Sequence, residues 1–267
     1  MTAPLFAFRL RPLEEIEPWH GPDGPGLSWF GLTDGAYWLS LADPAIVGLD
    51  ADISASPLYC DYQVARLFDD LTELAPYALA EVPAQLHAFF AREAGRSWHD
   101  FREAWWHRAK DSPQTDELDG LMDAAAELRR LRTLDASHMQ SRPEILIWSS
   151  AGRVHIKWDV RGNAVDGAPV RGMVRGGATL TREQFIGELR DFCARLCEAM
   201  DERIRQVAQG ALAPAIRIDV EQLVREQALR RKQLEHELAN PRFADDWPAV
   251  VEAIGRLRDR RGADRRV

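Results

Sequence analysis

The amino-acid sequence predicts an α+β protein, in which strands and helices are segregated along the chain. Three observations favour this class: an aromatic hairpin signal near the N-terminus, four successive helical patterns over residues 61–131, and three strand patterns over residues 144–174 followed by three more helices. Alternating strands and helices would instead favour a doubly wound parallel sheet. We therefore expect an antiparallel sheet, built from the N-terminal hairpin and residues 144–174 and covered by about seven helices.

The N-terminal strands are predicted by a short apolar run at residues 5–10 and by residues 28–39, where aromatic-rich runs flank Asp34-Gly35. Asp-Gly between apolar runs is a strong short-range signal of a hairpin, and glycine takes the positive φ that a tight turn requires. Residues 11–26 are rich in proline and glycine, so we expect a loop there. Because an isolated hairpin is not stable in water, other strands must complete its sheet.

The first helices are predicted by apolar residues that recur at helical spacing. The pattern after Asp61, a residue type that often caps helices, predicts a helix that ends near Pro76. Further helices are expected over residues 84–94, 98–107 and 115–131.

The second half of the chain begins with strands. Residues 144–148 and 154–158 read as a hairpin, with Val154, Ile156 and Trp158 on one face and His155 and Lys157 on the other. A third strand is expected at residues 170–174, ended by Gly176-Gly177.

Three helices then follow these strands. Thr181 and Gln184 form a capping box that opens a helix running to about Gln209. Asp219 opens the next helix, which Asn240-Pro241 ends, and residues 245–258 form the last. We expect residues 1–267 to fold as a single domain; the alternative is a subdivision into residues 1–140 and 141–267.

The net charge of −8 is unevenly distributed. Residues 1–138 carry 11 basic and 23 acidic side chains, whereas residues 139–267 carry 23 and 19. An acidic half disfavours nucleic acid as a partner and suits a basic protein, although solubility alone also explains it. No apolar stretch approaches the about 20 residues of a membrane span, and no targeting signal is seen, so we expect no membrane partner and a cytoplasmic location.

Catalytic and metal-binding patterns are weak in this sequence. There is no Gly-x-Ser-x-Gly elbow, and the acidic neighbour of Cys60 raises the pKa of its thiol rather than activating it. His99, Glu103 and His107 recur at i, i+4 and i+8, a spacing that can hold a metal, but three ligands along one straight helix rarely converge on one ion. The segment 171–177 has glycines and arginines but lacks the lysine of a phosphate-binding loop. We expect no catalytic set, no metal and no cofactor.

Nine tryptophans fall in clusters and are the most unusual feature of the composition. Such rings form either a core or a recognition surface, and Trp105 and Trp106 cannot both face inward on one helix. The candidate binding residues are these: Trp29, Asp34, Tyr37, Trp38, Asp61, Tyr62, Arg66, Trp105, Trp106 and Arg108.

Several strings spread over most of the chain carry a family resemblance. They are Leu13–Trp19, Trp29–Gly35, Asp61–Arg66, Trp105–Arg108, Val154–Asp159 and Phe185–Arg203. Together they resemble an uncharacterised bacterial family, catalogued only as a domain of unknown function, and this resemblance implies no activity. The general pattern, an acidic α+β protein whose strands are followed by a helix of this composition, is similar to immunity proteins of bacterial toxin systems.

Two functional hypotheses follow. The first is a non-enzymatic protein that binds a basic protein such as a toxin through its acidic N-terminal half. The second is a small-molecule-binding protein or enzyme, with a pocket where the 28–39 hairpin meets the helix starting at Asp61. Asp34, Asp61, Tyr62 and Arg66 would supply its polar groups, and Trp29 and Trp38 its walls. The sequence does not predict an oligomeric state.

Overall fold

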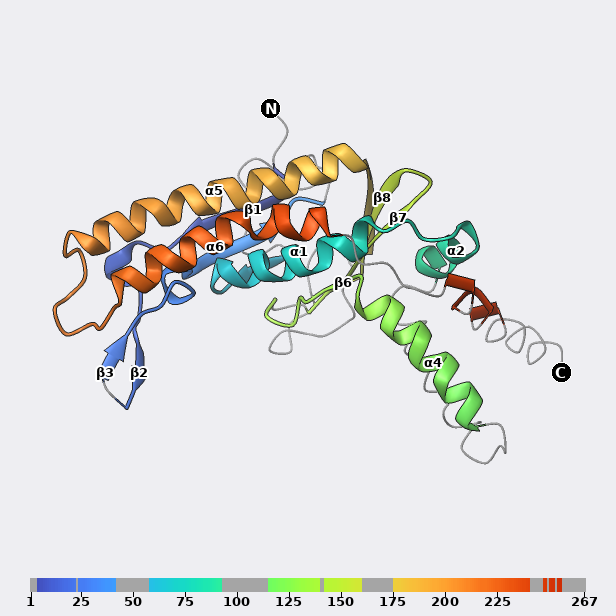
Figure 1. The fold of residues 1–267 in the computed structure, drawn as a ribbon, viewed down its shortest axis with the longest axis horizontal. Coiled ribbons are helices and arrows are strands. Elements are labelled where there is room, and N and C mark those ends of the chain that lie inside the picture. Colours follow the sequence, from blue (N-terminus) through green and yellow to red (C-terminus); the bar gives the residue numbers. More distant parts are fainter. Residues whose placement is uncertain are drawn as a thin grey trace.

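The chain folds into two main antiparallel sheets with helices packed on them, which confirms the α+β class (Figure 1). A computed structural model describes residues 4–22, 24–41, 58–92, 115–139, 142–159 and 175–240, and several residues between 247 and 255. The strands of the first sheet, in spatial order, are β1 (Phe6–Leu10), β4 (Gly35–Leu39) and β5 (Tyr59–Asp61). Those of the second are β6 (Thr133–Leu134), β7 (Glu144–Ser150), β8 (Arg153–Asp159) and β9 (Arg175–Thr181).

The predicted hairpin at residues 28–39 is wrong. Gly31–Thr33 forms a short 3-10 helix, and β4 pairs with β1 on one side and β5 on the other. Gly35 is needed for a different reason from the one predicted: a Cβ there would lie 2.3 Å from the carbonyl oxygen of Arg9 on the neighbouring strand. The local Asp-Gly signal is therefore overridden by pairing with distant strands, and the strands form two sheets rather than one.

A two-stranded ribbon lies within the Pro- and Gly-rich segment that was expected to be a loop. It consists of β2 (Trp19–Gly21) and β3 (Gly24–Gly26), and it projects from one end of the molecule (Figure 1). The backbone of Arg217 holds the end of this ribbon through two hydrogen bonds. The Leu27 N–H donates to Arg217 O (3.0 Å), and the Arg217 N–H donates to Pro25 O (2.9 Å). The ribbon is thus fixed at its base.

The β7–β8 hairpin forms as predicted, with its turn at residues 151–152. Val154, Ile156 and Trp158 are buried, whereas His155 and Lys157 lie half-buried on the opposite face. The third strand comes later than expected, because Gly176 and Gly177 lie inside β9 rather than ending a strand. Residues 170–174 lie outside the described residues.

The helices largely follow the predicted apolar stripes. They are α1 (Val64–Leu79), α2 (Ala84–Arg92), α4 (Thr115–Arg130), α5 (Arg182–Ala208) and α6 (Val220–Ala239). The predicted start of α1 is wrong, since Gln63 precedes its first residue and Asp61 belongs to β5. Its end is also later than expected, because Pro76 lies within the helix. The caps of α5 and α6 are confirmed: Thr181 and Gln184 form a capping box, and Asp219 accepts from the Gln222 N–H.

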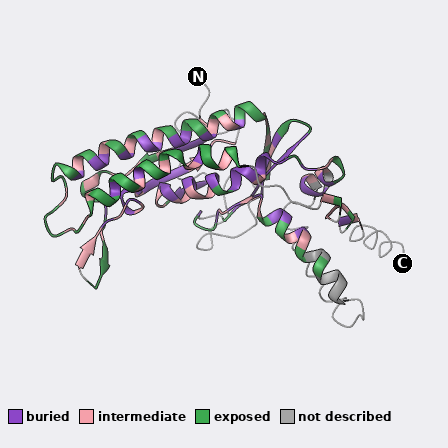
Figure 2. Ribbon diagram, viewed as in Figure 1, coloured by how far each residue is buried: buried purple, intermediate pink, exposed green. Residues whose placement is uncertain are grey.

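Helix α5 spans 27 residues and packs against strands of both sheets (Figure 1). Helices α1 and α6 lie beside it, and the buried residues of these helices face inward along their length (Figure 2). One large hydrophobic cluster contains Phe6 of β1, Trp29, Phe192 of α5 and Trp158 of β8. A smaller cluster joins Trp148 of β7 to the apolar side of α2. Among the described residues no helix combines the length and the apolar character that crossing a bilayer requires.

Candidate functional site

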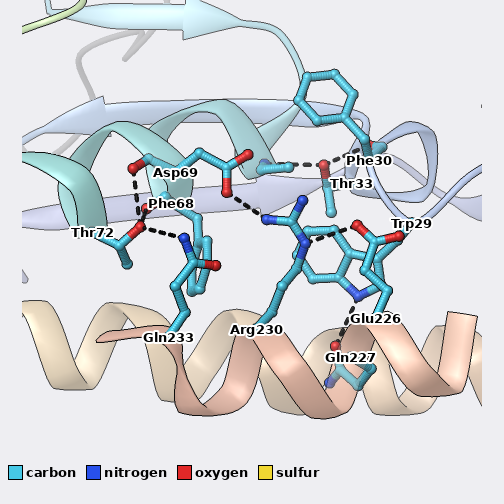
Figure 3. Close-up of polar contacts among 11 residues, drawn as sticks. Trp29, Phe30, Thr33, Phe68, Asp69, Thr72, Glu226, Gln227, Arg230 and Gln233 are labelled. Carbon is cyan, nitrogen blue, oxygen red and sulfur yellow. Dashed lines mark hydrogen bonds and ion pairs between the residues drawn. The ribbon is translucent and has the colours of Figure 1, made fainter. Parts of the chain in front are cut away.

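Trp29, the first predicted site residue, lies in the core and is held there by polar contacts (Figure 3). Its indole N–H donates to Gln227 Oε1 of α6 at 2.8 Å. The Gln227 amide nitrogen donates to Cys197 O (2.8 Å) and to Asp201 Oδ1 (2.7 Å), so both ends of the side chain are satisfied. The guanidinium carbon of Arg230 lies 4.1 Å from the centre of the indole ring. Trp29 therefore joins α6 to the first sheet and does not form the wall of an open pocket.

Arg230 extends the same network from α6 to α1 (Figure 3). It forms ion pairs with Asp69 of α1 and with Glu226 of its own helix. One turn further along, the Gln233 amide donates to Thr72 Oγ1 at 3.1 Å. The contacts of Arg230 with Asp69 and of Gln233 with Thr72 cross the interface between the two helices with matched donors and acceptors, so we interpret them as structural.

Asp34 and Asp61 are brought together as the pocket hypothesis required, but their shared partner is Arg11. The Arg11 side chain lies 3.0 Å from Asp34 Oδ2 and 2.8 Å from Asp61 Oδ1, and both carboxylates raise the pKa of the guanidinium. Buried Arg203 of α5 donates to the carbonyl oxygens of Leu32 and Arg11, and burial lowers its pKa to about 10. The two aspartates thus fasten strand ends together.

Arg66 lies apart from that pair, in a separate polar groove of about 440 Å³ on α1. It forms ion pairs with Asp70, at 3.1 Å, and with Asp135. Burial raises the pKa of Asp70 to about 7; Arg66 opposes the rise, whereas Asp135 and Glu73 add to it. A carboxyl group in this state takes up and releases a proton near neutral pH.

The remaining predicted residues are spread over the first sheet and its surroundings. Tyr37 is buried in β4, where burial and its hydrogen bond with Cys60 raise the pKa of the phenol. Trp38 is half-buried on the same strand. Tyr62 stacks on His138, with ring centres 4.4 Å apart and planes 8° apart. Trp105, Trp106 and Arg108 lie outside the described residues, as do His99, Glu103 and His107.

Within the described residues, the structure does not bring the predicted polar groups and tryptophan walls together in one pocket, although Gly35, Ala36 and Asp61 line a small cavity of about 250 Å³. Asp34 and Asp61 meet, but Trp29 is sealed in the core and Arg66 binds other carboxylates. Among the described residues no three His, Cys, Asp or Glu side chains lie together as a metal site needs.

Trp19 on the β2–β3 ribbon was not among the predicted site residues. Its side chain is 50% exposed, and its ring centre lies 5.9 Å from that of Phe30. A hollow of about 760 Å³ lies between the ribbon and residues 214–219. A large ring within a Pro- and Gly-rich segment has few neighbours able to bury it, and that signal could have identified Trp19 in the sequence.

A second group of residues that sequence reasoning missed lies on the second sheet. A groove of about 310 Å³ between α2, β8 and β9 is lined by side chains that include His87, His155, Lys157, Arg175 and Thr179. The alternation of β8 already predicted that His155 and Lys157 share a face. Their meeting with His87 and Arg175 depends on packing between elements distant in the sequence, which no local pattern encodes.

Comparison with known proteins identifies the family of this chain. The model of a family of unknown function, DUF5984, matches residues 5–253. The chain belongs to this family. No curated protein and no solved structure matches it.

In this DUF5984 protein, the segment 29–35, one of those that carried the resemblance, has a structural role. Three of its residues make contacts that hold the fold together. Trp29 bonds to Gln227, Thr33 Oγ1 accepts from the Ala65 N–H at 3.0 Å, and Gly35 permits the close approach of Arg9. The segment fastens α1 and α6 to the first sheet. The half-exposed Trp19 of the ribbon and the groove on the second sheet lie outside this segment.

Proposed function

We propose that this protein is a non-enzymatic binding protein, and that the β2–β3 ribbon carries the contact with a basic protein partner such as a toxin. The observation that supports this most is Trp19, a half-exposed tryptophan on an element that projects from the body of the molecule (Figure 1). Tryptophan is enriched among the few residues that dominate binding energy at protein interfaces, because it buries a large rigid surface.

The ribbon holds Trp19 in place before any partner binds. Its ring packs on Phe30, and a Cβ at Gly31 would lie 4.0 Å from the outer edge of the indole. The backbone bonds between residues 25–27 and Arg217 fix the base of the ribbon. A side chain that is already positioned loses less conformational entropy on binding, which favours affinity.

The charge of the segment that precedes the ribbon in the chain supports a basic partner. Glu14, Glu15 and Glu17 are exposed and directly precede Trp19 in the chain. They belong to the half of the sequence that carries 23 acidic and 11 basic side chains. Complementary charge speeds association and discriminates against acidic partners, whereas the central ring contributes most of the affinity.

The test uses the tagged full-length chain as bait in a lysate of its native host at low salt. Captured protein is identified, purified and titrated against the wild type, Trp19→Ala and the control Leu229→Ala. Leu229 of α6 is 72% exposed and distant from the ribbon in sequence. We expect a basic partner whose Kd rises at least about 30-fold with Trp19→Ala, as for an interface hot spot, and changes less than about threefold in the control.

The charge contribution is tested by the double substitution Glu14→Lys and Glu15→Lys, which should slow association and weaken its dependence on salt. Recovery of no stable partner at low salt, capture of an acidic protein, or unchanged binding by Trp19→Ala would each contradict the proposal.

A further inference from the structure

The groove on the second sheet has a lining unlike the rest of this acidic protein. Among the described residues that line it are two imidazoles, an ammonium, a guanidinium and a hydroxyl, and no carboxylate. It lies on the face of β8 opposite the main core, since Val154 and Trp158 belong to that core and do not line the groove. A lining that carries donors and positive charge without a carboxylate favours an anionic ligand.

The two imidazoles are held by an aromatic stack. Trp148 stacks with Phe90, with ring centres 5.6 Å apart, and with His155, at 5.2 Å. The Trp148 N–H donates to His87 Nδ1 at 3.3 Å, so the neutral His87 ring carries its proton on Nε2. His155 Nδ1 lies 3.3 Å from Thr179 Oγ1. Donors fixed in this way need little rearrangement to receive a ligand.

The two cations are placed beside these rings by different means. Lys157 Nζ donates to Ala91 O in the last turn of α2, which leaves the rest of its ammonium protons for other acceptors. Burial lowers the pKa of Lys157, Arg129 and Arg175 lower it further, and Asp159 and Glu144 oppose them.

Arg175 is exposed and forms no ion pair within the part of the chain that the structure describes. Its guanidinium fork is suited to bidentate contact with an oxyanion.

Glycine keeps the groove open above these cations. Gly177 pairs with Lys157 across the β8–β9 ladder, so the two residues face the same side of the sheet. A Cβ at Gly177 would lie 3.0 Å from Ile156 O, closer than most real contacts, so a side chain there meets resistance. The ammonium of Lys157 is therefore not covered from β9.

We propose that this groove binds the phosphate group of a small phosphate monoester. A phosphate offers three acceptor oxygens and a charge near −2, which match the several donors of the groove better than the two oxygens of a carboxylate do. The volume of about 310 Å³ exceeds the needs of a free anion and leaves room for an organic group beside the rings. Lys157 and Arg175 repel metal cations from the same place.

The test titrates the full-length protein with phenyl phosphate, inorganic phosphate and acetate by calorimetry at low ionic strength and neutral pH. Arg175→Ser and Thr179→Val remove exposed donors without touching the core, so folding should be preserved. The control is Arg153→Ser, which removes an exposed arginine of the same sheet that does not line the groove. We expect phenyl phosphate to bind more tightly than acetate. Arg175→Ser should raise the Kd for phenyl phosphate about tenfold or more, and Arg153→Ser should raise it less than about threefold.

A second readout is the titration of His155 by NMR. In the free protein, burial holds the pKa of His155 below its ordinary value. The neighbouring His87 and Arg153 lower this pKa further, whereas Glu81 raises it. A phosphate beside the ring favours the imidazolium, so saturation with phenyl phosphate should raise this pKa. The proposal is overturned if about 10 mM phenyl phosphate gives no saturable heat, if acetate binds as well, or if Arg175→Ser and Thr179→Val bind like the wild type.

Discussion

At the scale of single residues, two buried tryptophans differ in whether the indole N–H has a hydrogen-bond partner. The Trp29 N–H donates to Gln227 in the interface between α6 and the first sheet. The Trp158 N–H is buried without a hydrogen-bond partner among the described residues. Both side chains belong to the same hydrophobic cluster, so they lose similar packing when shortened. The comparison between them therefore reports on the polar contacts of Trp29, which are its hydrogen bond to Gln227 and its contact with Arg230.

Replacing Trp29 by phenylalanine should destabilise the protein more than the same change at Trp158. Trp29→Phe leaves Gln227 Oε1 buried without its donor and weakens the contact with Arg230, so the free energy of unfolding should fall by about 3 kcal/mol. Trp158→Phe removes an unsatisfied donor, and its cost should be smaller by about 1 to 2 kcal/mol. Urea denaturation measures the free energy of unfolding of both variants. Equal losses would contradict a stabilising role for the hydrogen bond between Trp29 and Gln227.

Asp70 should make stability decrease as the pH rises. Its pKa is raised from the ordinary 3.8 to about 7, so between these values the folded state binds more protons than the unfolded state. The stabilisation is complete below about pH 4 and is lost as the pH rises through 7.

Asp70→Asn should therefore unfold less readily than the wild type at pH 8, by an amount on the order of 2 kcal/mol, with the gain vanishing toward pH 4. Asp123→Asn, at an exposed position of α4, is the control. A less stable Asp70→Asn at pH 8 would show that the ion pair with Arg66 outweighs burial.

At the scale of elements, two glycines should respond to alanine with opposite sign. A Cβ on Gly35 would collide with the backbone of β1, at 2.3 Å from Arg9 O, and no side-chain movement relieves this. Gly187 is exposed on α5 and a Cβ there meets nothing within 4 Å. Gly35→Ala should lower the free energy of unfolding by more than about 3 kcal/mol, whereas Gly187→Ala should raise it by about 0.5 to 1 kcal/mol.

Thermal denaturation of the two variants checks this directly. A tolerated Gly35→Ala would mean that β1 and β4 separate at little cost, contrary to their continuous pairing from Phe6 to Leu10.

Elements with local signals could be predicted from the sequence, and elements with distant partners could not. Helix α5 begins where Thr181 and Gln184 predict, because a capping box involves neighbours in the chain. The segment 28–39 was misread because β4 pairs with residues 6–10 and 59–61, which no local pattern reveals.

The same distinction holds for the candidate sites. The shared face of His155 and Lys157 follows from strand periodicity, whereas His87 reaches that groove only through the packing of α2 on β7.

At the scale of the whole molecule, the two sheets share one hydrophobic cluster through α5. Phe185 and Phe192 of this helix lie 6.3 and 6.2 Å from Phe6 of the first sheet, in a cluster that also holds Trp158 of the second. We propose that the chain therefore forms one domain rather than units divided near residue 140.

Unfolding in urea should accordingly be a single cooperative transition. Tryptophan fluorescence reports on rings in both sheets and far-ultraviolet circular dichroism reports on the helices, and their midpoints should coincide. Two separated transitions, one of them restricted to the fluorescence of one sheet, would contradict a shared core.

Helix α5 also determines how far apart the two proposed binding regions lie. At 1.5 Å per residue its 27 residues extend about 40 Å, with β9 and the groove at its first turn and the segment that anchors the ribbon after its last. That separation lets a bulky macromolecule and a small anion occupy the protein simultaneously without steric conflict. Helix α5 and its packing connect the two regions, and by thermodynamic reciprocity any influence of one ligand on the affinity of the other would act equally in both directions.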